Sequence, residues 1–358
     1  MKDVTDILDL TVEQIDELMH IALDMIDHPE KYSEACKGKI LATLFYEPST
    51  RTRLSFESAM LSMGGSVIGF SGAQNASVSK GESVHDTSIV VSQLADIIAM
   101  RTLKEGAPLV AANSCDIPVI NAGDGGHNHP TQTLLDLLTI YHEKGTLENL
   151  TVGFCGDLKY GRTVHSLLNA LARYAGLKVI LISPEVLALP QWVKEDVLQK
   201  KCIPYTEVAS LEEAIPQLDV LYMTRIQKER FDSLEVYEQV KDLYVLDVEK
   251  MKLAKKDAIV LHPLPRVNEI SVKVDEDPRA CYFKQVKFGK YMRMALMYYL
   301  LHSADKKRQS IQEETITDIL KCDNPRCICS SEQELPHTFK KIHDNVYRCI
   351  YCEQEKKL

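Results

Sequence analysis

The sequence predicts an α/β protein with two doubly wound parallel-sheet domains, followed by a small β-rich metal-binding domain. Over the first 300 or so residues, short apolar runs alternate with stretches of helical periodicity, which is typical of parallel sheets covered by helices on both faces. The alternation forms two series, before and after about residue 135. Five of the ten cysteines lie within the last 37 residues, and in a reducing compartment such a cluster indicates a metal before it indicates disulfides.

Length and composition agree with this organisation. A chain of 358 residues is long enough for two domains and a small third, and its 45% hydrophobic and 26% charged residues are ordinary for a globular protein. The net charge of -9 argues against nucleic acid as a partner. The N-terminus lacks a signal pattern and no apolar run approaches membrane-spanning length, so we expect a cytoplasmic protein that does not bind membranes.

In the first series, the apolar run at residues 40–45 predicts a buried strand that ends before Pro48. Apolar residues at helical spacing predict helices at residues 5–26, 53–63, 83–94 and 131–142. Further strands are predicted at residues 66–70, 96–100 and 119–122. The stretch at residues 71–81 is too polar for a core, and we expect it to be a mobile surface loop.

The second series contains apolar runs that predict strands at residues 151–157, 178–182, 220–223 and 258–261. Beyond residue 303 the composition becomes rich in charge, which is typical of a linker or an exposed helix. We therefore expect two α/β domains, a linker and a cysteine-rich tail. Their expected bounds are residues 1–134 with about 285–305, then 135–284, 306–320 and 321–358.

The turn Ser49-Thr50-Arg51-Thr52-Arg53 lies between the first predicted strand and the helix after it. Free backbone N–H groups and the helix dipole favour an anion at such a turn. The guanidinium of Arg51 can add a two-pronged contact to phosphate oxygens. The alternative is an ordinary Ser/Thr N-cap with two solvated arginines, and the pentapeptide alone does not decide between the two.

Polar residues recur at the carboxyl ends of the predicted strands, where ligands of open α/β sheets bind. Taken singly, each has a simpler explanation: a histidine can be a core or turn residue, and most arginines and lysines are solvated. Their recurrence at one end of each strand is the reason to infer a site. The candidates are the turn at residues 49–52, Arg101, His129, Arg162, Arg225 and the turn at residues 262–266.

Two nucleotide-binding motifs are missing from the sequence. The segment Gly153-Phe154-Cys155-Gly156-Asp157 lacks the G-x-G-x-x-G spacing, and no P-loop is present. We therefore do not expect ATP or NAD in the site.

Five motifs, in order, resemble the catalytic chains of the aspartate carbamoyltransferase family over residues 1–305. They are Ser49–Arg53, His129-Pro130-Thr131-Gln132, Gly156–Thr163, Arg225-Ile226-Gln227 and His262-Pro263-Leu264-Pro265-Arg266. The resemblance implies the carbamoyltransferase fold and transfer of a carbamoyl group from carbamoyl phosphate to L-aspartate. The products are N-carbamoyl-L-aspartate and phosphate, in the biosynthesis of pyrimidines.

The resemblance also implies a role for each motif. Ser49, Thr50, Arg51 and Thr52 hold the phosphate, and Thr52, Arg101 and His129 contact the carbonyl oxygen. Gln132 and the Leu264-Pro265 turn, with a cis peptide, meet the carbamoyl amine. The aspartate carboxylates are held by Arg162, Arg225 and Gln227, near Pro263 and Leu264. Ser77, expected to bind carbamoyl phosphate, and Lys80, expected to bind aspartate, resemble a loop that reaches into a neighbour's site, which implies a homotrimer with shared sites.

This chemistry needs no cofactor, because donors around the oxyanion and cations around the phosphate lower the barrier electrostatically. We expect Arg51, Thr52, Lys80, Arg101 and His129 to be the catalytic residues. Two alternatives are an ornithine or other amino-acid carbamoyltransferase and a non-catalytic binding scaffold. Ornithine enzymes carry a His-Cys-Leu-Pro turn and a Ser-Met-Gly motif, whereas this chain has Pro263 and the Arg225–Gln227 segment.

The tail contains the pairs Cys322-x4-Cys327 and Cys349-x2-Cys352, separated by 21 residues. Such spacing can place four thiolates around one structural Zn²⁺. A tail of this size has little hydrophobic core, so it needs a cross-link such as a bound metal to fold. Cys329 is then spare, and His337 and His343 remain alternative ligands.

The tail resembles the zinc domain of the family's regulatory chain, here fused to a catalytic chain without the nucleotide-binding domain. We therefore doubt regulation by ATP or CTP and expect the tail to support subunit contacts. It either joins two trimers or stays within one.

Overall fold

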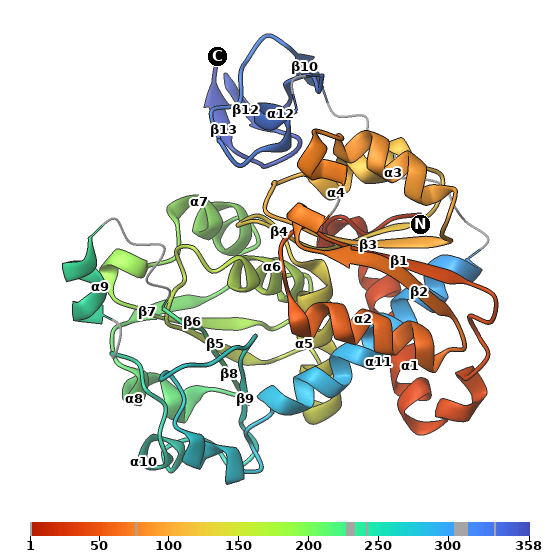
Figure 1. Cartoon of the computed structure of the whole chain (residues 1–358). Coiled ribbons are helices and arrows are strands. Elements are labelled where there is room, and N and C mark those ends of the chain that lie inside the picture. The colour runs from red at the N-terminus through yellow and green to blue at the C-terminus, as the bar shows by residue number, and fades with distance from the viewer. Residues whose placement is uncertain (1, 76, 227–232, 241–242, 304–313, 333) are drawn as a thin grey trace. The chain divides into compact units, whose positions relative to one another are not determined.

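The computed structural model describes residues 2–75, 77–226, 233–240, 243–303, 314–332 and 334–358. The chain forms two compact units (Figure 1). One comprises residues 1–131 and 290–358, and the other residues 132–289. Among the described residues, no helix is both long and apolar enough to cross a membrane.

The first unit contains a four-stranded parallel sheet in the order β2-β1-β3-β4. Its strands are β1 (Ile40–Phe45), β2 (Ser66–Ser71), β3 (Ile97–Thr102) and β4 (Val119–Asp124). Both β3 and β4 are buried along their whole length. This burial explains the apolar run Ile97–Met100 that begins β3, since both faces of a parallel sheet are covered.

Helices α1 (Val12–Asp27), α2 (Thr50–Ser62) and α3 (Val84–Ser92) of the first unit lie in segments predicted as helical, whereas α4 (Ala107–Ser114) was not predicted. Thr11 and Gln14 form a capping box that starts α1. The long helix α11 (Tyr282–His302) follows the second sheet in the chain. Single 3₁₀ turns lie at Ile7–Asp9, Pro29–Tyr32, Ala73–Asn75 and Ser77–Lys80.

The second unit contains a five-stranded parallel sheet in the order β7-β6-β5-β8-β9. Its strands are β5 (Thr151–Cys155), β6 (Lys178–Ile182), β7 (Tyr205–Val208), β8 (Val220–Met223) and β9 (Ile259–Leu261). Only β7 was not predicted. It is an edge strand without a fully buried residue, so it carries no apolar run.

Around this sheet lie helices α5 (Pro130–Lys144), α6 (Arg162–Leu171), α7 (Gln191–Val193), α8 (Leu211–Ala214), α9 (Leu234–Val240) and α10 (Val248–Met251). A π-helical turn spans Lys194–Gln199, and 3₁₀ turns span Glu185–Leu187, Ile215–Gln217 and Val272–Glu276. The alternation of strand and helix confirms the predicted α/β class of both sheets.

The tail forms a four-stranded antiparallel sheet in sequence order. Its elements are β10 (Thr315–Thr317), α12 (Ile328–Ser331), β11 (Thr338–His343), β12 (Val346–Cys349) and β13 (Glu355–Lys357). The β-rich character predicted for the tail is confirmed.

Two of the predicted boundaries that differ from the structure concern candidate site residues. The second helix begins at Thr50 rather than near Arg53, so the hydroxyl-rich residues form its first turn instead of a separate loop. The strand predicted to end at Met100 continues to Thr102, because Arg101 is buried and its backbone still pairs with Phe45 of β1.

Candidate active site and metal cluster

The turn at residues 49–53, the candidate anion site, lies where α2 follows β1. Ser49 is the N-cap residue of α2, but its side chain makes no capping hydrogen bond to the helix. Its hydroxyl donates instead to Oγ1 of Thr52 at 3.1 Å. The Ser49 hydroxyl therefore leaves the first-turn N–H groups uncapped, the arrangement that an anion can use.

The two arginines of this turn behave differently. Arg53 Nε contacts Glu57 Oε1 at 2.6 Å, one helical turn away. The side chain of Arg51 is exposed. Partial desolvation, and then the nearby positive charge of Arg101, lower the pKa of Arg51. A bound anion would relieve this repulsion between the two cations.

Arg101 and His129 come from neighbouring strand ends, since β3 and β4 pair directly. Both side chains are buried, and Arg101 Nη1 lies 3.5 Å from His129 Nε2. The Arg101 guanidinium also donates to the Ala122 carbonyl at 3.3 Å and pairs with Glu47 at 3.1 Å. A side chain at position 123 would clash, because a Cβ on Gly123 would lie 2.8 Å from Arg101 Nη1.

This charged cluster is incompletely satisfied. Within the described part of the chain, Nε of Arg101 and Oε2 of Glu47 are buried without a hydrogen-bond partner. Buried polar atoms are seldom left unpaired in folded proteins, and an exception needs an explanation. A polar ligand beside Arg101 would supply one.

The second unit presents two arginines at neighbouring strand ends. Arg162 is the first residue of α6 and follows the loop after β5, whereas Arg225 follows β8. Strands β5 and β8 pair in parallel. Thr224 joins the two loops, because its hydroxyl donates to the Cys155 carbonyl at 2.8 Å and accepts from the Asp157 N–H at 2.9 Å.

The turn after β9 contains a cis peptide between Leu264 and Pro265, as the resemblance implies. The backbone N–H of Leu264 donates to His262 Nδ1 at 2.8 Å. Arg266, the last residue of the motif, lies against Tyr282 and pairs with Asp275 through both nitrogens. Arg266 is therefore engaged within the protein.

Three predicted residues have little or no description. Gln227 lies outside the described residues. Ser77 begins the 3₁₀ turn Ser77–Lys80, of which only the backbone is described at Ser77. Lys80 ends this turn with an exposed side chain.

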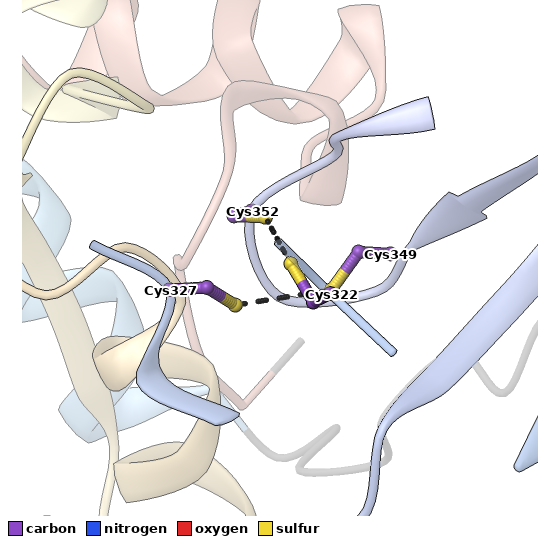
Figure 2. Close-up of side chains that lie close together, drawn as sticks. All are labelled: Cys322, Cys327, Cys349 and Cys352. Atoms are coloured by element: carbon purple, nitrogen blue, oxygen red, sulfur yellow. Dashed lines mark hydrogen bonds between the residues drawn. The ribbon is translucent and has the colours of Figure 1, made fainter. Parts of the chain in front are cut away.

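The structure brings together the thiols of Cys322, Cys327, Cys349 and Cys352, all buried, with their Sγ atoms within 4.8 Å of one another. Figure 2 shows the four side chains pointing toward one another. The Sγ atoms of Cys322 and Cys352 are 3.5 Å apart, and those of Cys327 and Cys349 are 3.8 Å apart. Tetrahedral zinc with Zn–S bonds of about 2.3 Å needs sulfur atoms about 3.8 Å apart, so the cluster fits such an ion.

The tail also contacts the loop between β3 and α4 of the first unit, through the buried side chain of Glu105. Its carboxylate pairs with Arg326 at 3.0 Å, accepts from the Asn324 amide, and accepts from the Gly126 N–H at 3.2 Å. Its backbone exchanges hydrogen bonds with Arg326 and Ile328. Glu105 therefore links the segment between Cys322 and Cys327 to the loop that precedes His129.

A close backbone approach reinforces this contact. A Cβ on Gly106 would lie 2.5 Å from Cβ of Tyr351, so only glycine fits there. Beside it, Glu353 Oε2 lies 3.5 Å from His127 Nε2.

Three models of known protein families match successive parts of the chain. The model "Aspartate/ornithine carbamoyltransferase, carbamoyl-P binding domain" matches residues 2–142, and the model of the "Asp/Orn binding domain" matches residues 148–300. The chain belongs to the aspartate/ornithine carbamoyltransferase family. The tail, residues 314–357, matches the metal-binding domain of the aspartate carbamoyltransferase regulatory chain.

Curated relatives define the branch of the family. The aspartate carbamoyltransferase catalytic subunit of Lachnoclostridium phytofermentans is 61% identical over 302 residues, which cover 84% of this chain and 98% of the relative. That of Clostridium perfringens is 60% identical and covers 85% and 99%. The activity of the chain is accordingly that of an aspartate carbamoyltransferase.

Solved structures agree. The catalytic subunit of M. jannaschii aspartate transcarbamoylase has a TM-score of 0.79 and 46% identity, covering 84% of this chain and 98% of that chain. The Trypanosoma cruzi enzyme with carbamoyl phosphate and aspartate has a TM-score of 0.78 and 39% identity, covering 83% and 96%.

Sequence reasoning missed several residues that hold these side chains. They include Glu47, which pairs with Arg101, Thr224, which joins the two arginine loops, and Glu105, which contacts the tail. Of these, only Glu47 could have been singled out from the sequence, because it is a charged residue close to the end of a predicted buried strand. The others are ordinary polar residues whose partners lie far away in the sequence.

Proposed function

We propose that the turn Ser49–Thr52 binds the phosphate of carbamoyl phosphate, and that Arg101 and His129 stabilise the carbonyl oxygen. The uncapped first turn of α2 and the partly satisfied guanidinium of Arg101 support this assignment. During transfer the amine of aspartate attacks the carbonyl carbon, negative charge develops on the oxygen, and phosphate leaves. Fixed donors and cations lower the energy of that charge distribution.

Binding of L-aspartate is assigned to residues of the second unit. We assign Arg162, Arg225 and Gln227, with Pro263 and Leu264, to the two carboxylates of L-aspartate. The pairing of β5 with β8, and the Thr224 link between their loops, support a joint role for the two arginines. Gln132, Leu264 and Pro265 are assigned to the carbamoyl amine, and Ser77 to carbamoyl phosphate.

The tail is a structural metal domain in this proposal. Four thiols at distances suited to a tetrahedral ion favour Zn²⁺, one per chain, held by Cys322, Cys327, Cys349 and Cys352. The ion would stabilise the tail and take no part in the transfer. Cys329 and His337 lie beside this cluster, because Cys329 Sγ is 3.3 Å from Cys327 Sγ and 3.4 Å from His337 Nδ1, but we do not assign them as ligands.

The wider setting is also proposed. We infer a cytoplasmic enzyme of pyrimidine biosynthesis, in which Lys80 of a neighbouring chain completes each site of a homotrimer. The four-part division of the chain expected from the sequence is retained. The tail supports contacts within or between trimers and does not sense nucleotides.

A phosphate-release assay with either aspartate or ornithine tests the function directly. Turnover that requires both carbamoyl phosphate and aspartate is expected, with negligible turnover on ornithine. Release without dependence on aspartate would contradict the assignment. Strong inhibition of the purified chain by CTP would contradict the proposed role of the tail.

A further inference from the structure

A buried hydrogen-bond network in the second unit connects the two segments that we assign to the carbamoyl amine. At its centre is Asp136 of α5, which is fully buried. Its Oδ1 accepts from the Gln132 amide at 2.8 Å and from the Gln285 amide at 2.6 Å. Its Oδ2 accepts from the Tyr222 hydroxyl at 2.9 Å.

This arrangement sets the orientation of the Gln132 amide. A carboxylate only accepts hydrogen bonds, so the NH₂ group of Gln132 must face Asp136 and its Oε1 must face away. Burial, and then the charge of Asp136, raise the pKa of Tyr222 well above its usual value, so its hydroxyl remains a donor. The Oε1 of Gln132 is thereby presented as an acceptor.

Gln285 extends the network from α5 to the turn after β9. Its NH₂ group faces Asp136, and its Oε1 accepts the backbone N–H of His262 at 2.8 Å. Gln285 is almost completely buried, so neither bond is replaced by bulk water if it is lost. One side chain thus ties together the two segments.

Glu269 fixes the other side of the turn. His262 accepts the Leu264 N–H at Nδ1, so the neutral ring carries its proton on Nε2, which lies 2.7 Å from Glu269 Oε1. Burial by itself would raise the pKa of Glu269, but the hydrogen bonds from His262 and from the Val267 N–H lower it overall. A buried carboxylate in this position selects the tautomer that holds Leu264.

We propose that Asp136, Gln285 and Glu269 are positioning residues that orient the acceptors for the carbamoyl amine and so determine the preference for a carbamoyl over an acetyl donor. The proposal rests on the assignment of Gln132, Leu264 and Pro265 above. Acetyl phosphate has the same phosphate and carbonyl, but a methyl group replaces the amine. Disorder among the amine acceptors should therefore weaken use of carbamoyl phosphate and spare acetyl phosphate.

The test is Gln285→Met in the full chain, with Gln217→Met on the exposed surface as a matched control. We expect kcat/KM for carbamoyl phosphate to fall ten-fold or more, while the inhibition constant of acetyl phosphate changes less than three-fold. Equal weakening of both, or no change in kcat/KM, would overturn the proposal. The control should change neither quantity.

A second variant keeps the test decisive if Gln285→Met does not fold. Glu269→Met, which removes the acceptor of the His262 Nε2–H, should show the same selective loss at smaller size, and ¹⁵N spectra of histidine-labelled protein should show His262 losing its single Nε2–H tautomer. An unchanged tautomer or a non-selective loss would contradict the proposal.

Gln132→Met tests the underlying assignment separately. It removes the proposed direct contact with the carbamoyl amine. If Gln132→Met loses the selectivity for carbamoyl phosphate over acetyl phosphate and Gln285→Met keeps it, only the positioning network is rejected. Full selectivity in Gln132→Met rejects the assignment itself.

Discussion

Among the residues proposed to act in catalysis, Arg51 and Arg101 differ in how the protein holds them. Arg101 is buried and held by Glu47, whereas Arg51 is exposed at the first turn of α2. Arg101 is thus preorganised by the protein, and Arg51 is available to the ligand. A preorganised cation stabilises developing charge at little cost in reorganisation.

Replacement of Arg51 by alanine should reduce turnover by about a hundred-fold or more, since a charge-stabilising donor at the leaving phosphate is removed. The side chain is exposed, so thermal unfolding and the circular dichroism spectrum should not change. Phosphate release at saturating substrates measures the effect.

Arg53→Lys is the matched control, because Arg53 lies two residues away and pairs with Glu57. Turnover in this variant should stay within about three-fold of the parent, less than 1 kcal/mol in barrier height. Near-normal turnover in Arg51→Ala would remove the phosphate assignment.

At the scale of elements, strand pairing determines which loops cooperate. The loops after β5 and β8 follow neighbouring strands, and the hydroxyl of Thr224, in the loop after β8, bonds to the Cys155 carbonyl and the Asp157 N–H at the end of β5. The loop after β9 is held separately by Glu269. The arginines assigned to aspartate therefore depend on Thr224, and the turn assigned to the amine depends on Glu269.

The variant Thr224→Val removes both hydrogen bonds of the hydroxyl while nearly preserving its volume. One lost bond corresponds to about 1 kcal/mol, so KM for aspartate should rise about five-fold. The KM for carbamoyl phosphate should not change. Initial-rate kinetics with each substrate varied in turn measure the effect.

A suitable control is Thr206→Val, on an exposed position of the edge strand β7. It should leave both KM values unchanged. A parallel rise in both KM values for Thr224→Val would indicate general damage rather than loss of aspartate positioning.

For the molecule as a whole, the tail distinguishes this chain from the two catalytic subunits compared above, which cover 84% and 85% of it. The four cysteines come from the segment before α12 and from the end of β12 and the turn after it. A metal at this point would cross-link the tail sheet, whose own apolar core is small.

Chelation should therefore release about one zinc ion per chain and reduce hydrogen-exchange protection in β11 and β12. Protection should also fall at residues 124–128, because Glu105 joins this loop to Arg326 and Asn324. Metal analysis and exchange mass spectrometry measure these effects. Absence of bound metal, or full protection after its removal, would contradict the proposal.

The proposed shared site predicts complementation between two inactive variants. If Lys80 acts in a neighbour's site, a trimer that mixes Arg51→Ala and Lys80→Ala chains contains some sites with both native residues. Activity should thus recover when the variants are unfolded and refolded together. Each variant refolded alone is the control, and no recovery in the mixture would place Lys80 in its own chain's site.

Most of the fold was predictable because helices and buried strands leave periodic apolar patterns. Eight of the nine strands of the two parallel sheets follow such runs, and β7 escaped because it lies exposed at an edge. The adjacency of Arg101 and His129 was not predictable, because the sequence does not give the order of the strands in the sheet, and only the structure pairs β3 with β4. Whether Ser49 caps α2 could not be predicted, because capping depends on the orientation of its side chain.

The sequence by itself determined the α/β class, the family motifs and the spacing of the tail cysteines, because these depend on residues close together in the chain. Only the tertiary structure decided which polar groups become partners. Glu47 pairs with Arg101, Gln285 joins Asp136 to His262, and Glu105 meets Arg326. Each bond spans many residues, and burial, rather than local pattern, selects it from many similar polar side chains.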